Sequence, residues 1–256
     1  MFLMMNRRRP ENITASILCA WILCLKINLK VKFDETYWLK AIKQPTWYIE
    51  LYELVQKIKS KHKDQEQTDK LNKQIRHFFE KELAAGNVAL GSDGYDFDQE
   101  REAIDTVVIH HTSHTPGYRL DYLNAVHLLN IYVPVYTKGQ AKGQPIWSGH
   151  FKKTKQVFWG YHWLMRMDGK FEHLLLDNEI GWHAGNWDIN KRSIGVCLDN
   201  DFEKQDPADH VLKKLAEFIN DHYPNTQIIG HCEAAKTICP GNHFIDTWKP
   251  KLLNYL

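Results

Sequence analysis

The sequence predicts an α/β fold in which a central mixed β-sheet is covered by helices and preceded by an N-terminal helical segment. From residue 106 onward, short apolar, β-branched runs alternate with segments of helical periodicity, as in strand–helix–strand units. In that region Asp168 and Gly169 separate two apolar runs, which is a strong signal for a two-residue hairpin turn. With 43% hydrophobic residues, the 256-residue chain can bury a full core.

Local patterns place the individual elements. Apolar runs rich in β-branched or aromatic residues predict strands at 106–110, 158–167, 170–176, 193–199 and 226–230. Apolar residues spaced three and four apart predict helices at 119–132, 206–222 and 243–256. The predicted sheet and its helices therefore lie in a domain that spans residues 96–256.

Residues 33–95 form a predicted accessory segment. Apolar residues recur at helical spacing from Trp47 to Ile58 and from Leu71 to Leu83, which predicts two amphipathic helices packed as a hairpin. The lysines between these stripes either contact an anionic wall polymer or membrane, or simply form a solvated helix face. Residues 86–94 are typical of a linker.

The N-terminal residues 1–32 have the pattern of a targeting segment. Three arginines at 7–9 precede an apolar run at 13–25, as in signal peptides. This run is shorter than the about 20 residues that span a bilayer, and no Ala-x-Ala cleavage site follows it. We expect a signal peptide or membrane anchor, and hence export to the periplasm, cell envelope or medium. A buried core helix or an over-extended start is the alternative.

Composition narrows the possible functions. A net charge of +2 gives no support to nucleic-acid binding, which needs a strongly basic face. Five cysteines are too few for a disulfide scaffold. The 14 histidines stand out, because histidine is both a proton carrier near neutral pH and the commonest metal ligand.

Three residues at predicted strand ends could bind a metal ion. His110 ends the first strand, His231 follows the last, and Cys239 lies eight residues further on. Two imidazoles and one thiolate are a typical zinc set that leaves a fourth position for water. Alone, this spacing is weak, since His110 could hydrogen bond to backbone and Cys239 could be a small buried residue.

Five sequence blocks give these residues a context. They are Val-Val-Ile-His110-His111-Thr112, Trp159-Gly160-Tyr161-His162, Gly181-Trp182-His183-Ala184-Gly185, Asn190-Lys-Arg-Ser193-Ile-Gly-Val and His231-Cys-Glu followed by Thr237-Ile-Cys239-Pro-Gly. In this order they resemble the zinc-dependent N-acetylmuramoyl-L-alanine amidases. That family includes the phage lysozyme-amidase, the animal peptidoglycan recognition proteins and the bacterial anhydro-muropeptide amidases. The resemblance covers about residues 104–256.

The resemblance implies a Zn²⁺ cofactor held by His110, His231 and Cys239. His110 is preferred over His111 because the period-two geometry of a strand turns His111 to the other face. Tyr161 and Thr237 match catalytic positions, where a phenol and a hydroxyl would steady the oxyanion. The plainer alternatives are a half-buried strand aromatic for Tyr161 and a turn cap for Thr237.

The resemblance also implies a substrate groove. His183 and Asn190 match positions that line it, and Trp182 could be a stacking platform. Each of these residues could instead belong to the core. Between His110 and Tyr161 the chain is longer than in the compact phage form, so the loop at 134–157 could select substrate or act as a lid. The cysteine at 239 resembles the phage and animal branch, which makes cytosolic recycling a weaker expectation.

The implied function is hydrolysis of peptidoglycan at the amide between the lactyl group of N-acetylmuramic acid and L-alanine, through a zinc-activated water. The implied partners are peptidoglycan or muropeptides, bound by a monomer that the N-terminal segment could tether to a membrane. A catalytically silent peptidoglycan-binding module, a partner-docking role for the helical segment and a zinc peptidase are the alternatives.

Overall fold

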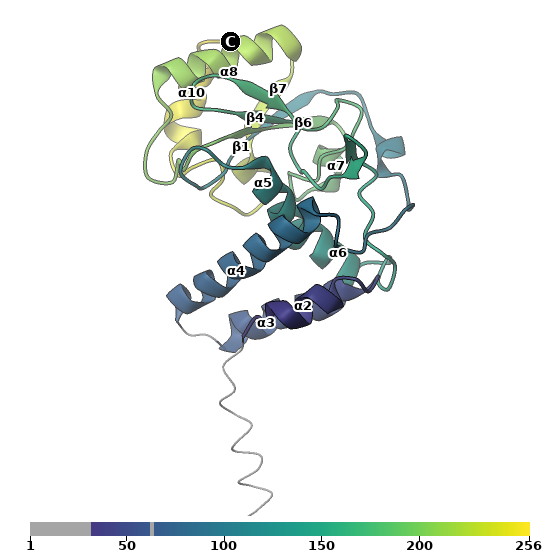
Figure 1. Ribbon diagram of the computed structural model, residues 1–256. Coiled ribbons are helices and arrows are strands. Elements are labelled where there is room, and N and C mark those ends of the chain that lie inside the picture. Colours follow the sequence, from purple (N-terminus) through teal and green to yellow (C-terminus); the bar gives the residue numbers. More distant parts are fainter. Residues whose placement is uncertain (1–31, 62–63) are drawn as a thin grey trace, which may run out of the picture. The chain divides into compact units, whose positions relative to one another are not determined.

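The computed structural model describes residues 32–61 and 64–256 (Figure 1). Residues 34–256 form one compact unit. The predicted targeting segment of residues 1–32 lies, apart from Lys32, outside the described residues. Within the described ranges, no helix is both long enough and apolar enough to span a bilayer.

A five-stranded mixed sheet forms the centre of this unit. Its strands, in spatial order, are β5 (Phe171–His173), β4 (Trp163–Met165), β6 (Ser193–Leu198), β1 (Thr106–His111) and β7 (Gln227–Gly230). The pairs β4–β6, β6–β1 and β1–β7 are parallel, whereas β4 and β5 form an antiparallel hairpin. The hairpin turns at Asp168-Gly169, where Gly169 has a φ of +86° that favours glycine. This arrangement confirms the predicted mixed sheet and its hairpin.

Helices cover both faces of the sheet (Figure 1). The helices are α2 (Glu35–Ala41), α3 (Trp47–Lys61), α4 (Gln65–Ala84), α5 (Leu120–His127), α6 (Val133–Lys138), α7 (Trp187–Asn190), α8 (Asp209–His222), α9 (His231–Ala234) and α10 (Lys249–Leu253). Side chains of β1 alternate between the faces: Val107 and Ile109 join the buried cluster of α8 and the C-terminal segment. His110 therefore points to the opposite face, where α5 packs.

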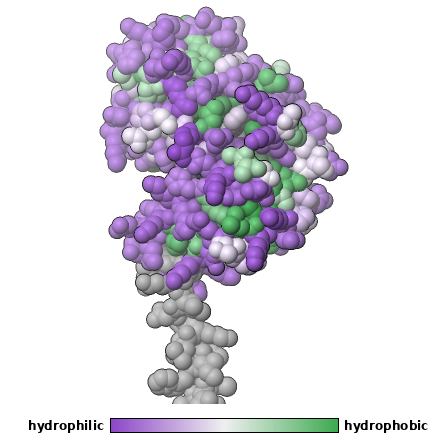
Figure 2. Space-filling model, viewed as in Figure 1, coloured by the Kyte–Doolittle hydropathy of each residue, from purple (hydrophilic) through white to green (hydrophobic). Residues whose placement is uncertain are grey.

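The accessory helices pack against the sheet-bearing half. Helix α4 contacts α5, and α3 contacts α6. The predicted apolar stripes account for this packing, because Leu51, Ile58, Ile75 and Phe79 are all buried. The segment after α4 is anchored as well, since Gly91 N–H donates to the carbonyl of Ile146 at 2.8 Å. The face in Figure 2 is mostly hydrophilic, with small hydrophobic patches between polar side chains.

Two elements differ from the sequence prediction. The helix expected at 119–132 continues to Lys138, through a π-helical turn at Leu128–Tyr132 and then α6. Pro134 is tolerated because it lies in the first turn of α6, where its missing N–H costs no helical hydrogen bond. In the expected loop, β2 (Phe151–Lys152) and β3 (Lys155–Gln156) pair as a short antiparallel hairpin.

A buried charge network fixes the loop that leads from β1 to α5. The Asp199 carboxylate is 1% exposed and accepts the N–H groups of Gly117 and Tyr118 at 2.8 and 3.2 Å. Arg166 donates to Asp199 at 2.6 Å and to the Tyr118 carbonyl at 2.7 Å. The guanidinium thus links the end of β4, the end of β6 and the loop.

Replacing Arg166 with methionine should destabilise the fold by about 3 kcal/mol, because the buried Asp199 carboxylate loses its countercharge. Urea unfolding measures this loss. Lys170→Met is the matched control: Lys170 pairs with Asp168 at 3.0 Å, but both side chains are exposed, so its loss should cost less than about 1 kcal/mol. Equal losses in the two variants would contradict the assignment.

Candidate metal centre

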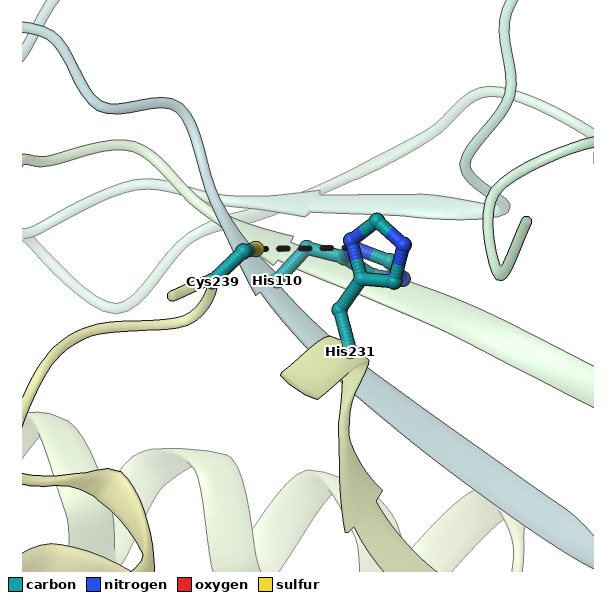
Figure 3. Close-up of side chains that lie close together, drawn as sticks. All are labelled: His110, His231 and Cys239. Atoms are coloured by element: carbon teal, nitrogen blue, oxygen red, sulfur yellow. Dashed lines mark hydrogen bonds between the residues drawn. The ribbon is translucent and has the colours of Figure 1, made fainter. Parts of the chain in front are cut away.

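Three potential metal ligands meet beside the carboxyl ends of the parallel strands (Figure 3). His110 lies on β1, His231 begins α9 directly after β7, and Cys239 lies in the loop that follows α9. One ligand atom from each side chain lies within 4.8 Å of the other two. The Cys239 Sγ is 3.8 Å from the His110 Nδ1. The structure thus brings together the three residues that the sequence predicts as ligands.

The pleat of β1 decides which of two adjacent histidines faces this cluster. His110 points toward His231 and Tyr161, with ring centroids 4.7 and 4.8 Å away. His111 lies on the other face, where its Nδ1 accepts the Phe202 N–H at 3.0 Å. Its ring is therefore committed to the segment after β6.

A second buried histidine holds the His110 ring. The His110 Nε2 lies 3.0 Å from the His183 Nδ1, and the His183 Nε2 lies 3.3 Å from the Ser193 Oγ. Because the Nε2 of His110 has this partner, its Nδ1 is the nitrogen that faces Cys239. The chain of contacts fixes the ring orientation of His110, as outer partners of metal-bound imidazoles do.

His231 and Cys239 are also held by backbone groups. The His231 ring hydrogen bonds to the backbone of Ala184, which opposes the lowering of its pKa by burial. Burial raises the pKa of the Cys239 thiol to about 12, while the backbone N–H of His111 acts in the opposite direction. The Cys239 carbonyl accepts the Cys232 N–H at 2.7 Å, which closes the loop between the two ligands.

The electrostatics of this cluster suit a cation. Burial, with His183 and His231 nearby, lowers the pKa of His110, so that its imidazole is neutral and keeps a lone pair. A bound divalent ion would offset the cost of ionising the buried Cys239 thiol. Two neutral imidazoles and a thiolate are donors that zinc prefers. The residues present therefore fit a zinc ion.

Tyr161 packs directly beside the cluster. Its half-buried ring lies 4.8 Å from both the His110 and the His127 rings, measured between centroids. The phenol hydrogen bonds to the Cys197 thiol, and burial raises its pKa well above the ordinary value. Tyr161 is therefore a neutral hydrogen-bond donor at physiological pH.

Thr237 lies in the loop that carries Cys239. Its Oγ1 accepts the Cys239 N–H at 3.2 Å, as a turn cap does. Its hydroxyl proton stays available, because a hydroxyl can accept and donate at the same time. The two roles considered for Thr237 are thus compatible with each other.

The three predicted substrate-binding residues lie in different surroundings. His183 and Asn190 are buried, and the Asn190 Oδ1 accepts the N–H groups of His183 and Ala184 at 3.2 and 2.8 Å. These two side chains support the metal cluster from behind. Trp182 is partly exposed and stacks on Tyr132 with centroids 4.6 Å apart. Their roles toward substrate stay predictions.

Sequence reasoning missed several neighbours of the cluster. Cys197, opposite His110 in the β1–β6 register, contacts the Tyr161 phenol. The period-two pattern could have found it, since paired residues on adjacent strands share a face. His127 accepts the Gly160 N–H at 2.7 Å, which fixes the residue before Tyr161. Nothing in the sequence links these two residues, because the contact depends on how α5 crosses the sheet.

The chain is similar to several known proteins. Two peptidoglycan-recognition proteins of the short type, from Drosophila simulans and Drosophila melanogaster, are each 29% identical over 104 residues, or 36% of this chain and 56% of theirs. The chain thus spans about half the length of the curated relatives it matches. The amidase LysCS from Clostridium intestinale URNW has a TM-score of 0.42 at 18% identity, covering 65% of this chain and 93% of its own. For Drosophila peptidoglycan recognition protein SD the TM-score is 0.37 at 20% identity, covering 60% and 83%.

A family model provides the remaining comparison. The model described as N-acetylmuramoyl-L-alanine amidase matches residues 100–242, which is more than half of the chain. The match contains the five sequence blocks and all three clustered side chains. This chain therefore belongs to the N-acetylmuramoyl-L-alanine amidase family.

Proposed function

We propose that the protein is a zinc-dependent hydrolase that cleaves the amide between the lactyl group of N-acetylmuramic acid and L-alanine of the stem peptide. The observation that supports this most is the convergence of His110, His231 and Cys239 in a chain of the amidase family. The proposed substrate is peptidoglycan or a muropeptide released from it. Two imidazoles and one thiolate leave a position for water, which is typical of catalytic rather than structural zinc sites.

His110, His231 and Cys239 would hold the ion. When bound in such a site, zinc polarises a carbonyl and lowers the pKa of a water molecule to about 7. The contact with His183 keeps the Nδ1 of His110 facing the cluster. Tyr161 and Thr237 would donate hydrogen bonds to the amide oxygen as negative charge develops on it.

The surroundings suggest how substrate is held. Trp182, Phe97 and Trp187 form edge-to-face contacts at 5.1 to 6.1 Å beside the cluster-bearing segment 181–185. Their aromatic surface would stack on the sugar or the peptide. In this proposal residues 96–256 carry the site, residues 33–95 brace it through α4 and α5, and residues 1–32 direct export.

A peptidoglycan-binding role without catalysis is the second candidate. The similarity to peptidoglycan-recognition proteins favours binding, but the complete ligand set favours catalysis. Both candidates share peptidoglycan as the partner, so the product decides between them.

The test uses the full chain loaded with zinc and a defined muramoyl tripeptide. Mass spectrometry should show free tripeptide with an L-alanine amino terminus, and a chelator should abolish its release. Restoring zinc should restore release. Stoichiometric zinc without release would overturn the hydrolase in favour of the binding module, and cleavage within the peptide would show a peptidase instead.

A further inference from the structure

A second concave site lies outside the metal centre, between α4 and the loop that follows β1. It is a cavity of about 590 Å³. One wall is a single face of α4, which includes Lys73, Arg76 and His77. The other wall comes from segment 114–122, at the start of α5. Helix α4 lies outside the residues matched by the family model, so this cavity is built jointly by the accessory segment and the amidase-family region.

Two of the cations that line this cavity differ from the others in their contacts. Arg119 donates to both oxygens of Glu80 at 2.9 and 2.7 Å, and His77 lies 3.2 Å from the same carboxylate. By contrast, no hydrogen bond or ion pair joins Lys73 or the half-buried Arg76 to the part of the chain that the structure describes.

The carboxylate on this wall does not neutralise them. Asp69 accepts a hydrogen bond from Gln65 at 2.9 Å and lies beyond 4.0 Å from any described lysine or arginine nitrogen. A guanidinium that is partly desolvated without a countercharge is costly. Lys73 and Arg76 therefore leave the cavity with an excess of positive charge.

The opposite wall is aromatic and rigid. The rings of His114, Tyr118, Tyr122 and His77 contact one another in succession, with centroids 4.8, 5.3 and 5.1 Å apart. The backbone of Tyr118 is fixed by the buried Asp199. The cavity is thus preformed, which lowers the entropic cost of binding.

We propose that this cavity binds an oxyanion, a carboxylate or a phosphate, carried by a larger organic molecule that packs on the aromatic wall. The planar guanidinium of Arg76 offers paired donors to either group, and Lys73 adds a point charge. The cavity is much larger than one such group, so the rest of the ligand contacts Tyr118 and Tyr122. Binding here does not require the metal ion.

Calorimetric titration of the full chain tests this site. The probes are triglutamate for a carboxylate and a glycerol phosphate trimer for a phosphate, with triglutamine as the neutral isostere of the first. We expect at least one anionic oligomer to bind, and the one that binds identifies the oxyanion. In Arg76→Gln its Kd should rise about tenfold, as expected for loss of a charge-assisted hydrogen bond.

Matched variants keep the result interpretable. Lys70 is exposed on α4 but does not line the cavity, so Lys70→Gln should leave the Kd unchanged. Lys73→Gln alters an exposed side chain and should weaken binding even if Arg76→Gln misfolds. Binding should persist in chelator, which separates this site from the proposed hydrolase. Equal weakening by Lys70→Gln, equal binding of triglutamine, or no binding of either anionic oligomer would overturn the proposal.

Discussion

Replacing Cys239 with alanine is expected to remove zinc from the protein and to reduce release of the tripeptide to the level of the chelator-treated wild type. The thiol is the only one of the three ligand side chains that would bring a negative charge to the ion. Its loss should lower zinc affinity by more than about 100-fold, beyond what loss of an outer partner causes. Elemental analysis of the dialysed protein and the tripeptide assay measure the two effects.

Cys232 provides the matched control for this variant. It is a partly exposed cysteine in the same loop, and only its backbone N–H contacts Cys239. Cys232→Ala should retain both zinc and activity. If Cys239→Ala kept its zinc, or if Cys232→Ala lost it, the proposed ligand set would be wrong.

Replacing His183 with alanine should weaken zinc binding by about 10- to 100-fold, the range observed when outer partners of metal ligands are removed. The His110 Nε2, 3.0 Å from His183 in the native protein, would lose its partner in a fully buried position. The His110 ring could then rotate, and its Nδ1 would no longer be held toward Cys239. Competition with a chromophoric chelator measures the zinc affinity directly, without reference to hydrolysis.

A neighbouring buried histidine separates positioning from general loss of packing. His162 is fully buried, but its contacts are the Glu179 carbonyl at 2.9 Å and the Gly195 N–H at 3.0 Å. His162→Gln should lower the melting temperature with little change in the zinc affinity of the folded protein. His183→Gln should recover part of the affinity, since an amide can reach the same nitrogen. Equal affinities in His183→Ala and wild type would show that His183 only fills space.

Local patterns in the sequence determined most of the architecture. The β-branched run at β1, the turn at Asp168-Gly169 and the apolar stripes of α3 and α4 each specify a local conformation through steric preference or burial. The order of the five blocks was enough to indicate the amidase family and its three metal ligands. His110 could be chosen over His111 because the period of a strand is a local property.

Only the tertiary structure decided how distant residues meet. His183 lies 73 positions from His110, and nothing in either local pattern shows that their rings share a hydrogen bond. The same holds for Cys197 beside Tyr161, and for Arg76 facing Tyr118 across a cavity. Such pairs depend on the crossing of helices over the sheet and on the register of parallel strands. Local sequence therefore determined the elements and the ligand types, whereas long-range packing determined which side chains orient the ligands and which cations of the described chain remain unpaired.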